Sequence, residues 1–455
     1  MNKITPSNIW PDYESLHEWE QYYAQLPIEY RQSLEEGLDI AAHEDLFKAI
    51  SKMANSPQKE KMADILYEIV ANCPQVADHK YDEPSDLENI RALRPQFDHQ
   101  PHVMPDTNTM QDKILGAWLG RTCGCLLGKP IEGIRTNELW PLLKASGNFP
   151  LHRYIRKTDI SADMYENFNY DLKDKCFADT IAHAPVDDDT NYTVLAHLLL
   201  NKYGRGFTPQ DVARTWLACQ PKDAYCTAER VAFCNLVKGY MPPASAIYKN
   251  PYREWIGAQI RADYFGYINP GDPEMAADMA WRDASISHVK NGIYGEMWVA
   301  AMLAMAAISD NVMDIIRGGL AQIPANSRLH EAIAALLKDY QNGQDADRCI
   351  SNIHAAYDEN DAHDWCHTIP NALIVAAALL HGGGDFSKSI CMAVQAGFDT
   401  DCNGATVGSI LGMRGGSTCI GPDWTAPLNN CLDTSIFGVG KVNISEMAQA
   451  TMRHL

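Results

Sequence analysis

Apolar residues recur at helical spacing along most of the chain, and few stretches alternate strictly between apolar and polar positions. Residues 59–71 place Met62, Ile65 and Ile69 on one face, and residues 371–380 are Ala-rich and almost wholly apolar. The periodicity predicts an all-α protein. Further helices are expected at 14–23, 30–40, 45–53, 194–201, 209–217, 228–236, 274–288, 295–308 and 387–395, with two more between 309 and 345.

Proline content and charge divide the chain near residue 105. Residues 84–105 carry four prolines and are expected to form an extended linker. Residues 1–105 hold about twice as many acidic as basic residues and supply about half of the net charge of −20. We therefore expect an acidic, helical N-terminal extension at 1–105 and a main domain at 106–455. The extension is either a cap packed on the main domain or an arm that binds a partner with a basic surface.

Two acids stand one residue apart at the start of a small-residue helical pattern. Asp399 and Asp401 lie between Gly397 and Gly404. A helix N-terminus offers free N–H groups and positive potential to such carboxylates. Two anions this close repel each other unless a cation offsets the repulsion, and Mg²⁺ prefers oxygen ligands of this kind. A turn with a capping Asp is the alternative interpretation.

Three consecutive acids, Asp187, Asp188 and Asp189, precede a second apolar helical pattern. One of them would be enough to cap a helix, and capping alone remains a possible explanation. Consecutive helix residues point in different directions, so three acids can also face two cations or one cation and its waters. Two helix N-termini that carry clustered Asp would form a carboxylate-lined dinuclear site.

Together with two further stretches, these acids resemble the ADP-ribosylglycohydrolase family. Residues 114–133 resemble the opening small-residue helix of the family, which ends in Pro-x-Glu. Residues 187–190 resemble its Thr-Asp-Asp-Thr signature, 397–401 its second metal signature, and 284–288 its Ala-x-x-x-His segment. The four segments occur in family order across about residues 110–455. The resemblance implies a compact, orthogonal multi-helix catalytic domain.

The resemblance also implies roles for individual residues. It implies two Mg²⁺ ions held by Asp187, Asp188, Asp189, Asp399, Asp401 and Cys402, acid–base work by Glu132, Asp399 and Asp401, and substrate contacts by Gly257, Arg261 and His288. Taken alone, Arg261 fits a structural salt bridge equally well, and His288 fits a hydrogen-bonded core residue.

Two positions depart from the family pattern. Cys402 stands where many relatives have a hydroxyl ligand, and a soft thiol is a poor ligand for Mg²⁺. Asp187 adds a negative charge where the family usually has Thr or Ser. The two changes either offset each other and favour Mn²⁺, or weaken one of the metal positions.

The implied activity is metal-dependent hydrolysis of the N-glycosidic bond of ADP-ribosylated arginine on proteins, which reverses mono-ADP-ribosylation. The alternatives are another ADP-ribosyl linkage (serine, poly-ADP-ribose or a small molecule) and a catalytically weak binding protein on the same scaffold. Some relatives with N-terminal extensions resemble bacterial immunity proteins against ADP-ribosyltransferase toxins. A toxin bound through residues 1–105 is therefore a further expectation.

The composition of the chain narrows the range of its binding partners and of its cellular location. The net charge of −20 argues against a nucleic-acid-binding surface or an anionic membrane anchor. The 13 cysteines form no Cys-x-x-Cys pair and are odd in number, which favours reduced thiols. No apolar run reaches membrane-spanning length, and no apolar signal core follows Met1. We predict a cytoplasmic protein.

Overall fold

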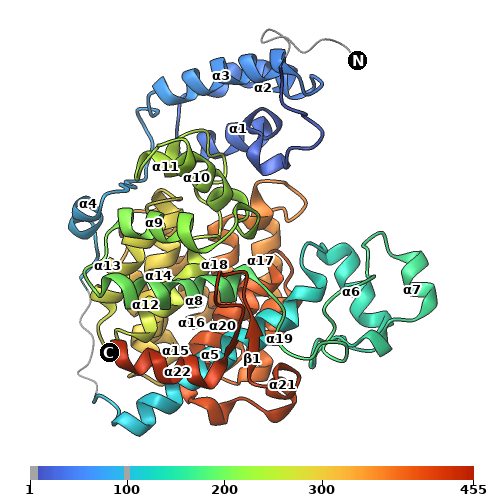
Figure 1. The fold of residues 1–455 in the computed structure, drawn as a ribbon, viewed down its shortest axis with the longest axis vertical. Helices are drawn as coiled ribbons and strands as arrows, with labels where there is room; N and C mark the ends of the chain where they lie inside the picture. The colour runs from blue at the N-terminus through green and yellow to red at the C-terminus, as the bar shows by residue number, and fades with distance from the viewer. Residues whose placement is uncertain (1–8, 97–102) are drawn as a thin grey trace.

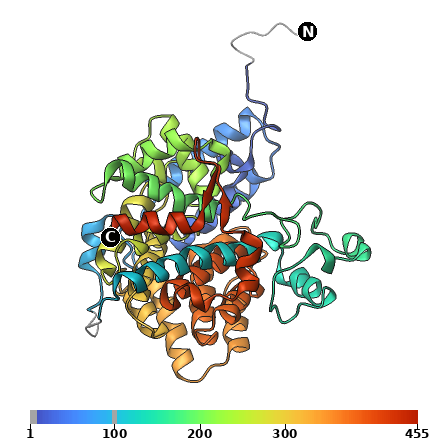
Figure 2. The same ribbon diagram turned by 60° about the horizontal axis from the view of Figure 1, so that its bottom comes forward.

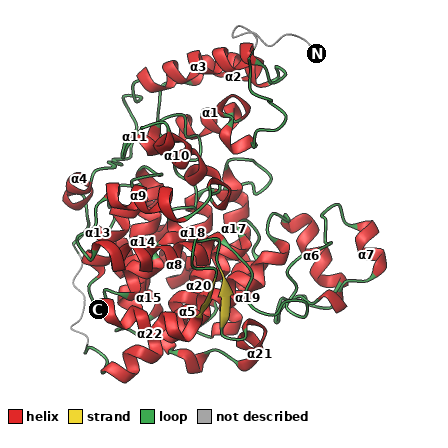
Figure 3. Cartoon of the chain, in the orientation of Figure 1, coloured by secondary structure: helices red, strands yellow, loops and turns green. Residues whose placement is uncertain are grey.

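The computed structural model describes residues 9–96 and 103–455, and its regular structure is almost entirely helical (Figures 1 and 3). Within these ranges the only paired strands are β1 (Cys431–Asp433) and β2 (Lys441–Asn443), which form a short antiparallel hairpin. The all-α prediction is therefore confirmed. Part of the predicted linker, 97–102, and the start of the chain lie outside the described residues.

Within residues 9–96, the N-terminal segment has four α-helices and a small core of its own. The helices are α1 (Leu26–Glu35), α2 (Glu44–Ser51), α3 (Pro57–Asn72) and α4 (Leu87–Ala92). Leu26, Phe47 and Leu66 meet in a hydrophobic cluster separate from the main one. The first three helices lie together at one end of the molecule (Figure 1). Helix α4 lies within the stretch that the prolines predict to be extended.

The helix predicted at 14–23 is wrong. The chain instead forms two short 3-10 turns, Glu18–Glu20 and Tyr22–Ala24, on either side of Gln21. The side chain of Gln21 donates a hydrogen bond to the carbonyl of Leu16 at 2.6 Å, and both neighbouring tyrosines are buried. This tertiary packing outweighs the local periodicity.

The main domain contains the remaining helices. They are α5 (Thr107–Gly128), α6 (Thr136–Ala145), α7 (Ala162–Asn167), α8 (Asp188–Tyr203), α9 (Pro209–Cys219), α10 (Thr227–Val237), α11 (Ala244–Ile247), α12 (Asp263–Tyr267), α13 (Pro273–Ala284), α14 (Lys290–Ala306), α15 (Val312–Leu320), α16 (Arg328–Gln341), α17 (Ala346–Ala356), α18 (Thr368–His381), α19 (Phe386–Gln395), α20 (Thr400–Gly415), α21 (Pro422–Thr425) and α22 (Ile444–Thr451). Helices α6 and α7 project from one side (Figures 1 and 2). Among the described helices, none is both long and apolar enough to cross a membrane.

Helices α5 and α20 pack backbone to backbone through glycines spaced four residues apart. A side chain at Gly120 would meet the carbonyl of Gly408, and one at Gly124 would meet that of Gly404. A side chain at Gly128 would meet the backbone of Asp401. Only glycine permits so close an approach. The antiparallel register therefore fixes the end of α5 against the first turn of α20.

The N-terminal segment is joined to the main domain by buried ion pairs. Arg253 donates to Glu36 at 2.5 Å and to Glu29 at 2.9 Å, and all three side chains are buried. Arg328 pairs with Glu83 at 2.8 Å and with Glu254 at 2.7 Å. The acids of this segment thus face inward as well as outward.

Candidate functional site

The two acidic stretches lie at the N-termini of α8 and α20. Asp187 caps α8, and its Oδ1 accepts a hydrogen bond from the N–H of Asp189 at 2.9 Å. Asp399 immediately precedes α20, whose first turn contains Asp401. The glycine contacts between α5 and α20 hold this turn against Gly128. Two helix N-termini with clustered carboxylates therefore meet in the interior, as the sequence indicates.

The loop that leads into α20 has an unusual backbone. Gly397 has φ +83° and Phe398 has φ +55°, a region that a side chain seldom tolerates. The Phe398 N–H donates to Glu359 at 3.4 Å, and the Asp399 N–H donates to Asn371 at 3.1 Å. These bonds stabilise a conformation that costs about 1–3 kcal/mol. The loop is thereby locked with Asp399 at the head of the helix.

Potential metal-ligating atoms converge in two overlapping groups. Atoms of Asp189, Asp401 and Cys402 lie within 4.8 Å of one another, as do atoms of Cys125, Asp187 and Asp189. All of these residues are buried. Within the described part of the chain, Asp189 Oδ2 and Asp401 Oδ1 are buried without a hydrogen-bond partner. A buried, unpaired carboxylate oxygen is costly, so the site is built for a group that these residues do not supply.

The electrostatics agree with this interpretation. Burial raises the pKa of Asp401 well above its ordinary value, and the charges of Glu132 and Asp399 raise it further. Burial also raises the pKa of Asp189, although Arg121 beside it acts in the opposite direction. A divalent cation would stabilise both groups as carboxylates. Oxygen ligands fit Mg²⁺ or Mn²⁺, and the Cys402 thiol suits a softer ion.

Two cations of the chain hold these carboxylates from α5 and the turn after it. Arg121 is fully buried, donates to Asp189 Oδ1 at 3.0 Å and to the Asp189 carbonyl, and also pairs with Asp263 at 2.7 Å. The Nζ of Lys129 donates to Asp187 Oδ2 at 2.6 Å. Arg121 leaves Asp189 Oδ2 without a partner, whereas the second oxygen of Asp187 already accepts the Asp189 N–H.

Asp188 and Glu132 lie at the rim of the site. Asp188 is half-buried, and Glu132 is exposed on the turn that follows α5. Desolvation by the surrounding protein and then the charge of Asp399 raise the pKa of Glu132, an effect that water at this exposed position partly screens. The hydroxyl of Tyr170, which lies just after α7, donates a hydrogen bond to the Glu132 carbonyl at 2.7 Å. The raised pKa is of the kind that acid–base catalysis uses, and the catalytic role of Glu132 stays a prediction.

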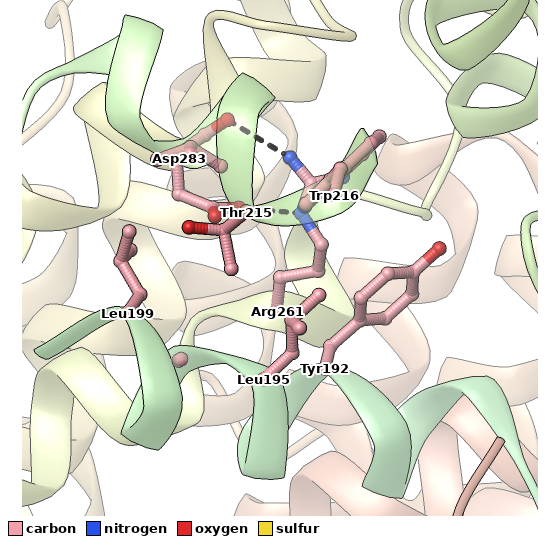
Figure 4. A pocket seen from close by; sticks show the side chains of 9 residues that line it. Tyr192, Leu195, Leu199, Thr215, Trp216, Arg261 and Asp283 are labelled. Carbon is pink, nitrogen blue, oxygen red and sulfur yellow. Dashed lines mark hydrogen bonds and ion pairs between the residues drawn. The ribbon is translucent and has the colours of Figure 1, made fainter. Parts of the chain in front are cut away.

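The three predicted substrate-binding residues lie in a neighbouring, tightly packed region. Arg261 is buried and pairs with Glu229 at 3.0 Å and with Asp283 at 2.5 Å. Arg261, Tyr192 and Leu195 line a cavity of about 10 Å³, which has room for no more than a water molecule (Figure 4). In this arrangement Arg261 is a structural salt-bridge partner, and its contact with substrate stays a prediction.

Gly257 and His288 are packed in the same region. A side chain at Gly257 would collide with the Glu229 carboxylate. His288 is buried, its Nδ1 lies 2.8 Å from the Ser287 hydroxyl, and burial lowers its pKa well below the ordinary value. Its Nε2 has no hydrogen-bond partner among the described residues. The proposed ligand contacts of Gly257 and His288 stay predictions.

Sequence reasoning missed three residues of the α5 face that contact or adjoin the acids. Arg121, Cys125 and Lys129 are spaced four residues apart, each one position after a glycine of the interlocking series. The spacing puts them on one helix face. That signal is present in the sequence, but its meaning depends on which helix packs beside it.

Comparison with known proteins identifies the family of the chain. The family described as ADP-ribosylglycohydrolase matches residues 106–453, and the chain belongs to this family. A solved structure described as "ADP-ribosylglycohydrolase-related protein complex" is similar at 18% identity and a TM-score of 0.44, covering 76% of this chain and 98% of that chain. No protein with a curated description matches the chain. Family membership, which indicates glycohydrolase activity on ADP-ribosyl linkages, rests on the sequence match.

Proposed function

We propose that this chain is a divalent-metal-dependent hydrolase that cleaves the N-glycosidic bond between ADP-ribose and arginine on modified proteins. The observation that carries the proposal is the pair of buried oxygens without partners, Asp189 Oδ2 and Asp401 Oδ1, at the meeting point of two helix N-termini. The family match supports the ADP-ribosyl part of the substrate.

The chemistry follows from the residues present. The glycosidic bond breaks through an oxocarbenium-like transition state, which needs a positioned ribose, a water and a proton acceptor or donor. A bound Mg²⁺ or Mn²⁺ would supply Lewis acidity at Asp189, Asp401 and their neighbours. Glu132 would accept or donate the proton from the rim, with Asp399 as the second candidate.

The rim favours arginine as the leaving group. Asp188 is half-buried and Glu132 is exposed there, so the outer face of the site presents negative charge to an incoming guanidinium. Serine-linked ADP-ribose and poly-ADP-ribose carry no such cation, and they and small ADP-ribosyl compounds are the alternative substrates. A catalytically weak ADP-ribose-binding protein is the alternative without chemistry.

Release of ADP-ribose from an arginine-ADP-ribosylated protein tests the proposal. The parent should release ADP-ribose with Mg²⁺ or Mn²⁺ and stop when a chelator is added. Asp401→Asn should lower the rate by roughly a hundredfold or more, because a required ligand is lost. Asp423→Asn, at an exposed position on α21, is the matched control and should keep the parent rate. If the protein binds ADP-ribose tightly but releases it from no linkage, the alternative of an ADP-ribose-binding protein without activity is favoured.

A partner-binding role for the N-terminal segment is the second proposal. Helix α3 exposes Met62 and Ile65 by 38% and 51%, three residues apart on one face, and α2 exposes Leu46. Exposed apolar side chains beside acids favour protein contact. We propose that residues 1–105 bind an ADP-ribosyltransferase toxin, as an immunity protein would. The Met62→Glu, Ile65→Glu double variant should lose toxin capture and keep hydrolysis, and unchanged capture would exclude this face.

A further inference from the structure

Lys129 lies inside the acidic centre rather than beside it. It follows α5, and its side chain is 21% exposed. Its Nζ contacts Asp187 Oδ2 at 2.6 Å. This contact is a charge-assisted hydrogen bond, and the carboxylates of Asp401 and Glu132 lie near enough to act on the same ammonium group. Lys129 therefore carries its positive charge into the same field of carboxylates that a metal ion would enter.

The carboxylate of Asp187 is fully used by the protein itself. Its Oδ1 accepts the N–H of Asp189 at 2.9 Å, and its Oδ2 accepts Lys129. A metal ion that approached Asp187 would be repelled by the Lys129 ammonium group, which lies 2.6 Å from Oδ2. The group formed by Cys125, Asp187 and Asp189 thus already has a cation bound to one of its members.

The other group remains open. Asp189 gives its Oδ1 to Arg121 at 3.0 Å, which leaves Oδ2 without a partner. Asp401 Oδ1 is buried and likewise has none among the described residues. These two residues and Cys402 bring ligand atoms within 4.8 Å of one another. One position has unsatisfied ligands, and the neighbouring position has a tethered ammonium group.

We propose that Lys129 is a built-in cation that replaces one of the two metal ions, so that the centre binds a single divalent ion at Asp189, Asp401 and Cys402. The inference rests on the proposed function, since it concerns the metal of that same site. The ammonium balances the extra negative charge of Asp187. The single ion then has a thiol among its neighbours, which favours Mn²⁺ over Mg²⁺.

Metal stoichiometry tests the inference without reference to activity. Titration of the full-length protein with Mn²⁺ should give one ion per chain by calorimetry. Its electron paramagnetic resonance spectrum should be the six-line spectrum of an isolated ion. Lys129→Met removes the internal cation and leaves Asp187 unpaired, so the stoichiometry should rise from one to two, with coupling between the ions.

Lys113→Met is the matched control. Lys113 lies on the same helix and donates to the carbonyls of Met413 and Arg414, away from the acids, so its removal should leave the stoichiometry at one. Two coupled ions in the parent would overturn the inference and leave the proposed function standing. Absence of Mn²⁺ and Mg²⁺ binding in the parent would overturn both. The parent result decides the question even where Lys129→Met fails to fold.

Discussion

The hydrogen-bond partners of individual carboxylate oxygens determine which of them can bind a metal ion. Asp189 has one oxygen held by Arg121 and one without a partner, whereas Asp187 has both oxygens satisfied by the chain. The residue names alone would count both as metal ligands. Their hydrogen bonds distinguish the two: Asp189 has an oxygen that a cation could bind, whereas Asp187 already pairs with the ammonium group of Lys129.

The buried side chain of His197, outside the proposed metal site, should make the stability of the protein depend on pH. The Nδ1 of His197 lies 2.7 Å from the Tyr264 hydroxyl. Burial, and then the charges of His454 and Arg453, lower its pKa to about 4. The unfolded chain has a histidine pKa of about 6.5 and so binds the proton first as pH falls. The stabilisation is complete above about pH 6.5 and is lost between pH 6.5 and 4.

His197→Gln should therefore flatten the pH dependence of stability. Between pH 7.5 and 5, the parent should lose about 2 kcal/mol of unfolding free energy through this group, and the variant should not. Urea unfolding at several pH values measures the difference. Equal slopes for the two proteins would show that His197 does not titrate in this way.

At the scale of helices, the glycines of α5 and α20 position the site. Gly120 and Gly408 face each other with no space for a side chain, and the same register sets Gly128 against Asp401. The spacing of the two helices therefore determines how far the first turn of α20 lies from Lys129.

Gly408→Ala should force the two helices apart. We expect a loss of about 1–3 kcal/mol in unfolding free energy, since the added methyl meets a backbone carbonyl that cannot move aside. Urea unfolding and Mn²⁺ affinity should both report the change. Gly206→Ala is the control, because an added methyl there has no atom within 4 Å. If Gly408→Ala and Gly206→Ala were equally stable, the contact between α5 and α20 would tolerate a wider spacing of the two helices.

The helices themselves were largely predictable because their apolar stripes are long. The predicted 209–217 and 228–236 match α9 and α10 within two residues. The β1–β2 hairpin was not predicted, since three-residue strands give little periodic signal, and the amphipathic α17 was missed. Asp399 and Asp401 stood out because two acids at a helix start are conspicuous. Lys129 did not, because its role comes from packing against Asp187, 58 residues further along the chain.

At the scale of the whole molecule, the N-terminal segment and the main domain share buried charges. Arg253 of the main domain has Glu29 and Glu36 of the segment as partners, and Lys290 also reaches Glu36 at 2.8 Å. Removal of one partner from a buried ion pair leaves a charge that water cannot reach. Deletion of the whole segment would therefore test stability and partner binding together, which makes point variants more informative.

Glu36→Ala should destabilise the protein by about 3 kcal/mol, because Arg253 loses one of its two carboxylates in a buried setting. Thermal or urea unfolding of the full chain measures the effect. Glu44→Ala removes the exposed Lys48–Glu44 pair on α2 and should cost less than about 0.5 kcal/mol. Equal effects would mean that the segment is attached only loosely.

A crystal structure with Mn²⁺ and ADP-ribose, recorded at the manganese absorption edge, tests most directly whether this site is the hydrolytic centre. We expect anomalous density beside Asp189 and Asp401, with the ribose of ADP-ribose against it and its anomeric carbon toward Glu132. Density elsewhere, or ADP-ribose bound away from these two carboxylates, would contradict the assignment of this site as the hydrolytic centre.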